Sequence, residues 1–470
     1  MKQTFLAILI AGAALAQGRF QPGLKPFLAT ESPVIALTHV RVIDGTGATA
    51  REDQTVIVDH GKIAAIGPAS STPAPAGAQV MDLAGHTVIP GIVGMHEHLY
   101  YPGGGGVPMY PEMAYSFPRL YLAAGVTTAR TAGSVEPFTD LSVKKMIDEG
   151  RMPGPSLYIT GPYLEGKGTS APQMHELTGP DDAVKMVNYW ADQGATSFKA
   201  YMYITHAELK AAVDAAHARG IKVTGHLCSI GFREAAAIGI DNLEHGLLAD
   251  TEFHPGKQPD VCPPNTRNEV ARLDLNTAPV KAMIADLVSH SVAITSTLAV
   301  FEAFDGDRPP VEQRFLDAVS PEAAVGYLTA RSRARGGADS PALAALKKEL
   351  EFEYAFVKAG GLLMAGADPT GNGGALAGFA DQRNIELLVE GGFTPLEAIR
   401  IATANGAKFL GQLDRIGTIA PGKQADLVLI TGNPATRIAD IRNVKLVFRE
   451  GAAYDPAKLL ESVRGQAGLR

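Results

Sequence analysis

IVGMHEHL, residues 92–99, is the stretch that decides the fold. Its first four residues have no polar side chains, as in a strand buried on both faces, and His96 and His98 follow them. Side chains alternate along a strand, so these two imidazoles point to the same side. A single His at a strand end is usually an ordinary hydrogen-bonded residue, but two on one side favour a metal site.

Further short apolar segments follow this one, with helical patterns between them. They occupy residues 126–131, 156–161, 196–201, 221–226, 241–245, 292–298 and 361–368. HAELKAAVDAAHARG, residues 206–220, is typical of the helical stretches, with apolar residues three and four apart and Gly220 as a stop. Eight strand–helix units predict an α/β fold with a closed (β/α)8 TIM barrel over residues 90–410. The long helical stretch at 301–360 indicates an insertion before the last strand.

Both ends of the mature chain have a different pattern, with alternating apolar and polar residues and Gly-containing turns. The two regions, 34–89 and 411–455, are separated by more than 300 residues. They predict one small composite β-sandwich into which the barrel is inserted.

The N-terminus is typical of an exported protein. Lys2 is followed by an apolar run at 4–16 that ends in Ala-Leu-Ala. The run is shorter than the roughly 20 residues of a transmembrane helix, so we expect a signal peptide at 1–16 and cleavage before Gln17. An uncleaved membrane anchor is the alternative. Cleavage predicts a secreted or periplasmic protein without further membrane contact.

Composition narrows the range of partners. The formal net charge is −7 and basic residues form no cluster, which argues against nucleic acid and favours a small-molecule substrate, with a homo-oligomer possible. The only two cysteines, Cys228 and Cys262, exclude a disulfide framework. We favour two separate thiols over a single bridge.

Polar residues with metal-binding chemistry recur at the predicted strand ends, where barrel active sites lie. Lys199 is on the fourth strand, His226 ends the fifth, His245 ends the sixth and Asp368 ends the eighth. Asp368 can join His96 and His98 in an open catalytic site, and His226 with His245 offers a second pair of nitrogens. Arg130, near the end of the second strand, is interpreted as a salt-bridge residue at the barrel rim, with an anionic substrate as the alternative partner.

Lys199 is the unexpected member of this set. An ammonium beside two cations is disfavoured, and burial lowers the pKa of a lysine toward the neutral amine. A neutral amine can capture carbon dioxide as a carbamate, whose two oxygens could bridge two metals. The alternative is a lysine that points outward and caps its strand.

GMHEHL, SFKAY, TGHL, LEHG and AGAD, in this order, resemble the metal motifs of the amidohydrolase superfamily, in its binuclear form with a carboxylated lysine. DGTG at 44–47 and IGTIAPGKQADLVLI at 416–430 resemble the β-sandwich of the same family. The resemblance implies that His96, His98 and Asp368 hold one divalent ion, usually zinc, and that His226 and His245 hold the other. It further implies that carbamylated Lys199 and a hydroxide bridge the two ions.

Hydrolysis of an amide bond in a peptide-like or N-acyl amino acid substrate is the predicted function. The bridging hydroxide would attack, and Asp368 would carry its proton to the leaving group. A lactone or phosphotriester hydrolase, and a non-catalytic metal-containing binding protein, are the alternatives.

The nearest branch is the imidazolonepropionase-like and prolidase-like one, whose pattern the chain leaves at two positions. Where members of this branch can have a Tyr that contacts the substrate carboxylate, this chain has His206. Where they can have a second His two residues after the ligand of the fifth strand, this chain has Cys228. Tyr201, Tyr203 and His206 are candidate substrate-binding residues, with plain packing or capping as the alternative.

Overall fold

The computed structural model describes residues 20–102, 109–169 and 171–469. The predicted signal peptide at 1–16 lies outside the described residues. Within them, no helix is both long and apolar enough to cross a membrane.

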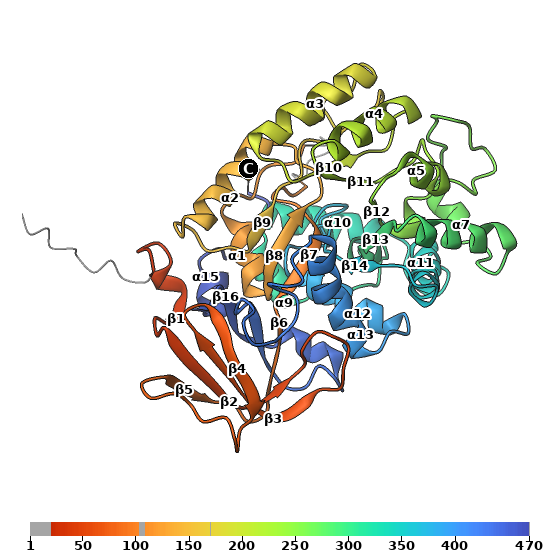
Figure 1. Cartoon of the computed structure of the whole chain (residues 1–470). Coiled ribbons are helices and arrows are strands. Elements are labelled where there is room, and N and C mark those ends of the chain that lie inside the picture. Colours follow the sequence, from red (N-terminus) through yellow and green to blue (C-terminus); the bar gives the residue numbers. More distant parts are fainter. Residues whose placement is uncertain (1–19, 103–108, 170, 470) are drawn as a thin grey trace, which may run out of the picture.

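A nine-stranded sheet combines strands from both ends of the chain. Its order is β1-β17-β16-β15-β6-β2-β3-β4, with β5 paired to β2. The N-terminal and C-terminal contributions meet where β6 pairs antiparallel with β15 and where β1 pairs antiparallel with β17, and Figure 1 shows β16 of the C-terminal segment in the same part of the molecule as β1. The strands are β1 (Leu28–Thr30), β2 (Val34–Val42), β3 (Arg51–Asp59), β4 (Lys62–Pro68), β5 (Gln79–Asp82), β6 (His86–Pro90), β15 (Leu427–Thr431), β16 (Val444–Arg449) and β17 (Ala452–Tyr454).

One hydrophobic core serves both halves of this sheet. Ile35 and Val56 from the N-terminal strands pack in the same cluster as Leu429 and Phe448 from the C-terminal strands. The sheet therefore cannot bury its apolar face until both ends of the chain are present.

Eight parallel strands form the centre of the molecule, at the eight segments predicted from the sequence. They are β7 (Ile92–Glu97), β8 (Val126–Thr131), β9 (Ser156–Tyr158), β10 (Ser197–Ala200), β11 (Lys222–Gly225), β12 (Asn242–Glu244), β13 (Ala293–Ser296) and β14 (Leu363–Ala365). The first three form one sheet and the other five form a second sheet in chain order. The predicted α/β class is confirmed.

The continuous ladder of a closed barrel is not found among the described residues, because the strands are divided between these two sheets. At one seam, isolated parallel bridges join Thr160 to Ser197 and Leu164 to Ala200. At the other, the backbone N–H of Asp368 donates to the carbonyl of His96 at 2.9 Å. The seam strands β9 and β14 have three residues each, so little paired backbone remains there.

Helices surround the eight strands (Figure 1). Those that alternate with strands are α1 (Ser116–Ala123), α2 (Pro137–Asp148), α3 (Pro180–Gln193), α4 (His206–His217), α5 (Phe232–Ile238), α7 (Ala278–Ser289), α12 (Phe379–Glu390) and α13 (Pro395–Arg400). The predicted insertion is helical, with α8 (Leu298–Glu302), α9 (Gln313–Ala318), α10 (Pro321–Arg333) and α11 (Pro341–Lys358). Shorter elements are η1 (Lys25–Phe27), η2 (Gly246–Leu248), α6 (Thr266–Val270), η3 (Ile401–Asn405), α14 (Gly406–Phe409), η4 (Ile438–Arg442) and α15 (Pro456–Glu461).

Local signals set the ends of these helices. Thr205 and Glu208 form a reciprocal capping box at the start of α4, and Gly220 adopts a positive φ of 68° just beyond its end. Helix α4 is thereby held directly after β10, the strand that carries Lys199.

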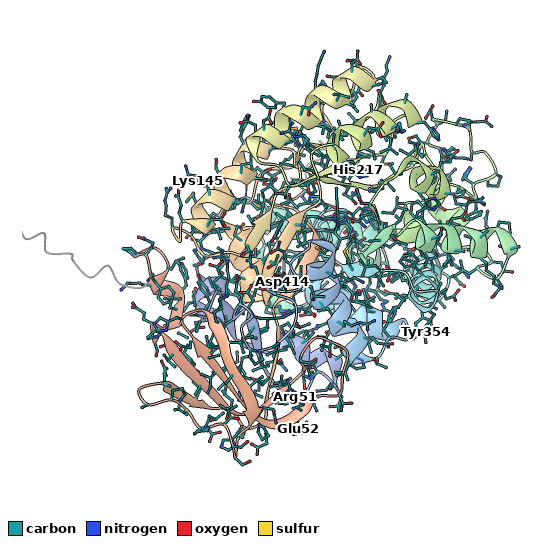
Figure 2. All side chains as sticks on the ribbon, in the orientation of Figure 1. Arg51, Glu52, Lys145, His217, Tyr354 and Asp414 are labelled. Carbon is teal, nitrogen blue, oxygen red and sulfur yellow. A yellow bond between two sulfur atoms is a disulfide. The ribbon has the colours of Figure 1, made fainter. Side chains whose placement is uncertain are left out.

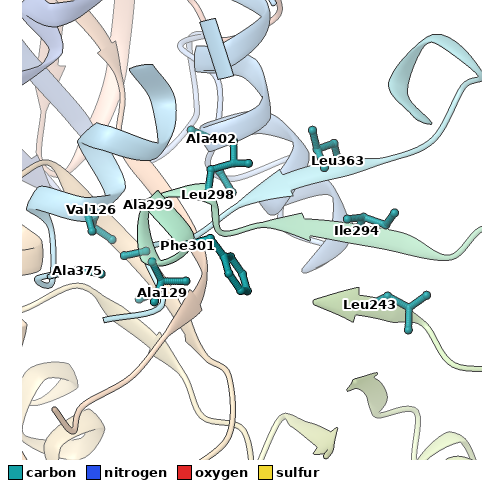
Figure 3. Close-up of a cluster of buried hydrophobic side chains, with 14 of the residues drawn as sticks. Val126, Ala129, Leu243, Ile294, Leu298, Ala299, Phe301, Leu363, Ala375 and Ala402 are labelled. Carbon is teal, nitrogen blue, oxygen red and sulfur yellow. The ribbon is translucent and has the colours of Figure 1, made fainter. Parts of the chain in front are cut away.

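The main hydrophobic core lies between the strands and the helices. In Figure 3, Leu243, Ile294 and Leu363 project from neighbouring strands. Charged side chains such as Arg51, Lys145 and Asp414 lie on the exterior (Figure 2). This arrangement leaves the carboxyl ends of the eight strands as the place where polar side chains converge.

Candidate active site

One cavity of about 260 Å³ is lined by all six predicted metal ligands: His96, His98, Lys199, His226, His245 and Asp368. They come from five strands or their carboxyl ends, so the convergence spans the two parallel sheets. The sequence prediction placed them at strand ends, and the structure brings all of them to the same cavity.

His96 is oriented by a buried carboxylate. Its Nδ1 lies 2.8 Å from Glu244 Oε2, which leaves Nε2 facing the cluster, 3.1 Å from Lys199 Nζ and 3.7 Å from Asp368 Oδ1. A carboxylate on one ring nitrogen fixes the tautomer that presents the other nitrogen to a metal.

His98 is held in the same way by the backbone. Its Nδ1 lies 3.2 Å from the carbonyl oxygen of Gly133, and its Nε2 lies 3.4 Å from Asp368 Oδ1. The ring stacks on Tyr100 with centroids 4.4 Å apart. His96 and His98 therefore present Nε2 to the same carboxylate, as their spacing predicts.

His245 and His226 form the second pair. Their ring centroids are 4.4 Å apart, and the His245 ring lies 4.6 Å from that of His96. His245 has a positive φ of 68°, and its Nδ1 lies 2.6 Å from the hydroxyl of Thr297. The left-handed backbone turns the end of β12 inward, at a cost of order 1–3 kcal/mol typical of such functional positions.

Lys199 is buried and points into the cluster, which contradicts the alternative of an outward-facing lysine. Burial lowers its pKa to about 8, although Glu244 and Asp368 act in the opposite direction. A considerable fraction of the amine is therefore neutral near that pH and free to react.

Asp368 completes the group. Burial by itself would raise its pKa, but the contacts with His96, His98 and His245 hold that pKa well below its usual value. The Thr370 hydroxyl donates to Oδ1 at 2.7 Å. Asp368 is therefore a carboxylate with both oxygens directed at the imidazoles.

His96, His98 and Asp368 meet the geometric condition for holding one ion, with one ligand atom from each within 4.8 Å of the others. Burial lowers the pKa of His98 to about 4 and also lowers those of His96 and His245. Neutral imidazoles and an ionised carboxylate are the forms that bind divalent metals, so the donor set fits a catalytic ion.

Glu244 is the main residue that sequence reasoning missed. It is fully buried and pairs with Arg130 at 2.6 Å in addition to orienting His96. The pair with Glu244 confirms the predicted salt bridge, but Arg130 is buried rather than at the barrel rim, and its Nε also donates to the carbonyl of Met95 at 2.8 Å. A charged residue inside the buried strand β12 was the available signal.

A tyrosine wall closes one side of the cavity, made by Tyr100, Tyr110, Tyr163 and Tyr201. The Tyr100 and Tyr163 hydroxyls are hydrogen-bonded, and burial raises the pKa values of Tyr100, Tyr163 and Tyr201. These hydroxyls are therefore protonated and able to donate.

The three predicted substrate-binding residues separate in the structure. Tyr201 lines the cavity, whereas Tyr203 and His206 do not. The Tyr203 backbone N–H donates to the carboxylate of Glu165 at 2.8 Å. His206, the first residue of α4, has its Nδ1 2.6 Å from the carboxylate of Asp260. The chain leaves the cavity after Met202, so of the three predicted residues only Tyr201 lines it.

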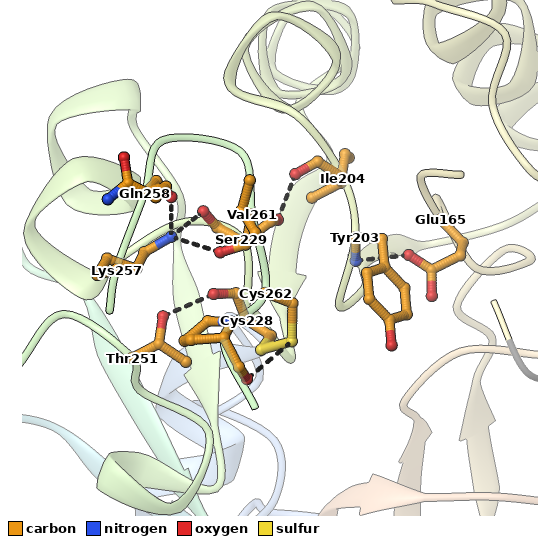
Figure 4. The surroundings of a disulfide bond; sticks show 11 residues. Glu165, Tyr203, Ile204, Cys228, Ser229, Thr251, Lys257, Gln258, Val261 and Cys262 are labelled. Atoms are coloured by element: carbon orange, nitrogen blue, oxygen red, sulfur yellow. Dashed lines mark hydrogen bonds between the residues drawn. A yellow bond between two sulfur atoms is a disulfide. The ribbon is translucent and has the colours of Figure 1, made fainter. Parts of the chain in front are cut away.

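Cys228 and Cys262 form a disulfide bond, which corrects the prediction of two separate thiols (Figure 4). The segment after η2 folds back over the end of β11, where Thr251 donates to the carbonyl oxygen of Cys228 at 2.6 Å. This return brings together two cysteines 34 residues apart, and no local pattern encodes it.

Comparisons with known proteins agree with this geometry. The amidohydrolase family model matches residues 87–453. The imidazolonepropionase of Streptomyces griseus is 24% identical over 440 residues, covering 88% of this chain and 96% of that protein. A solved Xaa-Pro dipeptidase with methionine bound in its active site has a TM-score of 0.68 and 20% identity, covering 90% of this chain and all of that one.

The bottromycin amidohydrolase structure has a TM-score of 0.69 and 21% identity, covering 95% of this chain and 94% of its own. At these identities, structural likeness establishes the fold, and the family model covers most of the chain. The chain belongs to the amidohydrolase family, is similar to an imidazolonepropionase and to a solved Xaa-Pro dipeptidase, and is a hydrolase that acts on carbon–nitrogen bonds.

Proposed function

We propose that the chain hydrolyses an amide bond of a small substrate with the help of two divalent ions, zinc being the expected metal. The observation that carries the proposal is the convergence of four histidines, a lysine and an aspartate on one cavity. The name of the solved Xaa-Pro dipeptidase, to which the chain is similar in fold, denotes hydrolysis of the amide bond of a dipeptide.

His96, His98 and Asp368 are proposed to hold one ion, and His226 with His245 the other. Lys199 lies 3.1 Å from His96 Nε2, where a carbamate on its nitrogen would reach both groups of ligands. Such ions lower the pKa of bound water to about 7 and polarise the carbonyl of the substrate.

Asp368 is the proposed proton carrier. Its carboxylate is ionised and faces the cluster, so it can accept a proton from the attacking water and donate it to the leaving nitrogen. No Ser or Cys lines the cavity among the described residues, consistent with direct attack by water.

The closed barrel, the composite β-sandwich and the signal peptide are also proposed. We infer that the two parallel sheets form one (β/α)8 barrel over residues 90–410, because bridges or hydrogen bonds connect both seams. The composite β-sandwich would comprise 34–89 and 411–455. Residues 1–16 are proposed as a signal peptide that directs the enzyme out of the cytoplasm.

A metal count combined with a substrate panel tests this function. The mature enzyme should contain about two divalent ions per chain by elemental analysis and should cleave members of an amide and dipeptide panel. K199A should lose metal and recover part of its activity with short carboxylic acids. K222A is the matched control, because Lys222 lies on the next strand and donates to the carbonyl of Phe409 outside the cavity.

Three results would point elsewhere. At most one ion with an unmodified Lys199 would contradict the binuclear site. Turnover of lactones or phosphotriesters in place of amides would reassign the reaction. A metal-loaded protein inert to the whole panel would indicate a binding protein.

A further inference from the structure

We infer that Glu97 is a positioning residue for the first of the two proposed ions. It lies between His96 and His98 in the sequence and fixes the position of Asp368 relative to these two histidines. The inference rests on the metal site of the proposed function. It assigns a role to a buried acid that is not among the described residues lining the cavity.

The side chain of Glu97 belongs to the opposite face of its strand from the two histidines. Side chains alternate along a strand, so the residue between two that face the cavity is directed at the helices behind it. Glu97 is the last residue of β7 and is only 1% exposed. Burying a carboxyl group is costly unless it has partners, so the partners of Glu97 indicate what it does.

The Glu97 side chain connects β7 to the segment that carries Asp368. Its Oε1 accepts a hydrogen bond from the backbone N–H of Ala367 at 3.1 Å. Ala367 lies beyond Ala365, the last residue of β14, and immediately precedes Asp368. Strands β7 and β14 lie next to each other (Figure 1), but among the described strands they belong to different sheets. The carboxyl oxygen therefore supplies a hydrogen bond that the backbone would supply in a continuous sheet.

The backbone of Asp368 depends on this support. It has a positive φ of 45°, a conformation that a residue other than glycine keeps only when surrounding contacts hold it. Two contacts from β7 do so, because Glu97 holds the N–H of the preceding residue and the carbonyl of His96 accepts the N–H of Asp368 at 2.9 Å. The approach is close, since a Cβ at Gly366 would lie 2.4 Å from the backbone nitrogen of His96. A shift of this segment would displace the Asp368 carboxylate from the histidines.

The histidine side of the ligand group is held by separate contacts. The Tyr121 hydroxyl of α1 donates to the carbonyl of His98 at 2.9 Å and accepts from the N–H of the same residue at 3.2 Å. Strand β7 is also paired with β8 along its length. Loss of the Glu97 carboxyl group would therefore leave His96 and His98 in place and release Asp368.

A second acid behind the strand explains how Glu97 is kept in position. Burial and the adjacent Asp381 of α12 raise the pKa of Glu97 well above its usual value. Asp381 is itself fixed at the start of α12, where it accepts the backbone N–H of Gly378 at 3.0 Å. A protonated Glu97 can donate to Asp381 while its Oε1 accepts from Ala367. One side chain thus joins β7, α12 and the segment of Asp368.

Two substitutions of similar size separate the hydrogen bond from packing. Glu97→Gln keeps an acceptor for Ala367 and can donate to Asp381, whereas Glu97→Met fills the same space without an oxygen. Chelator competition on the purified proteins measures their affinity for zinc. We expect this affinity to fall about 10- to 100-fold in Glu97→Met, the range typical for loss of a residue that orients a ligand, and to stay within about threefold of wild type in Glu97→Gln.

The visible absorption of the Co²⁺-substituted proteins gives a second measurement, because its bands depend on the geometry of the ligands. We expect Glu97→Gln to reproduce the wild-type bands and Glu97→Met to alter them, with unchanged circular dichroism. Asp426→Leu is the control, because Asp426 is a buried acid that accepts the backbone N–H of Glu450 at 2.7 Å, far from the cavity in the chain's terminal sheet. It should lower stability and leave both the zinc affinity and the bands unchanged.

The outcomes separate this inference from the proposed function. Wild-type affinity and bands in Glu97→Met would overturn the inference, and so would an equal loss in Glu97→Gln, since the acceptor would then not matter. If Glu97→Met does not fold, Glu97→Val makes the same comparison, because valine suits a strand and offers no acceptor. A wild-type protein that binds zinc without cleaving amides would contradict the proposed function, whereas the expected contrast between the two variants would still support the inference.

Discussion

At the residue scale, the site depends on what holds the second ring nitrogen of His96, His98 and His245. Glu244 holds His96, the carbonyl of Gly133 holds His98 and Thr297 holds His245. Each contact leaves the other ring nitrogen available to the cavity. Mutation of partners of this kind typically lowers metal affinity about 10- to 100-fold.

Glu244→Gln tests this positioning. The amide can still contact His96, but Arg130 loses its buried counter-charge. We expect metal affinity to fall about 10- to 100-fold in a chelator competition, and the free energy of unfolding to fall by about 3–5 kcal/mol. Glu234→Gln is the control, because its pair with His206 is solvent-accessible and worth about 0–1 kcal/mol. Unchanged metal affinity in Glu244→Gln would show that Glu244 serves only the salt bridge.

Asp368→Asn tests the proton carrier. The amide keeps similar size and one ligating oxygen but cannot accept a proton at neutral pH. We expect kcat to fall about 10²–10⁴-fold with little change in KM. The ion content is measured on the same sample, since Asp368 also lies within the ligand group. A variant with full metal content and near-normal kcat would restrict Asp368 to a ligand and move the proton to another group such as His245.

At the element scale, the inserted helix α11 supports the strand ends from behind. Glu349 accepts a hydrogen bond from the backbone N–H of Leu248 at 3.2 Å, and Glu353 accepts one from Ser296 at 2.9 Å. Both carboxyl groups are buried, one turn apart. They attach the insertion to the segment after His245 and to β13.

The protonation of Glu353 predicts a pH dependence of stability. Burial raises its pKa to about 8, so the folded protein holds a proton that the unfolded chain releases above about 4.5. The unfolded state therefore binds fewer protons between these values, and stability falls as pH rises through this window, by at most about 1.4 kcal/mol per pH unit for one group.

Glu353→Gln should flatten this decline, because a glutamine keeps polar groups for Ser296 without titrating. The measurement is the free energy of unfolding in urea between pH 5 and pH 8. Glu351→Gln, on the exposed side of the same helix, should keep the wild-type slope. Identical slopes in all three proteins would contradict a protonated Glu353.

At the scale of the whole molecule, the terminal sheet and the strand–helix region share packing. Val447 and Tyr454 of the sheet lie in one cluster with Leu122 of α1. Arg449 at the end of β16 donates to Ser156 of β9 at 3.3 Å. We therefore expect the two regions to unfold as one cooperative unit.

Phe448→Ala tests this coupling, because Phe448 is fully buried in the terminal sheet. The free energy of unfolding should fall by about 3–5 kcal/mol. Trp190, the single tryptophan, lies in α3 of the strand–helix region, and its fluorescence should report the same shifted transition as circular dichroism. Val80→Ala, at a position 56% exposed on β5 of the same sheet, should change stability by less than about 0.5 kcal/mol. An unshifted Trp190 transition in Phe448→Ala would mean that the two regions unfold separately.

The sequence by itself determined the elements and the chemical identity of the site. All eight parallel strands coincide with segments marked by short apolar runs, and His96, His98, Lys199, His226 and Asp368 were recognisable at or near their ends. Strand periodicity and turn signals are local, because they depend on neighbours within a few residues. Such properties can be read from one chain segment at a time.

Only the tertiary structure decided the pairings between distant segments. His96 and Glu244 are 148 residues apart, and the Cys228–Cys262 bond depends on a loop that returns to β11. The same holds for the tyrosine wall, and for the exclusion of Tyr203 and His206 from the cavity. Each of these contacts exists because strands from different parts of the chain end side by side, and packing, rather than local propensity, determines which side chains then meet.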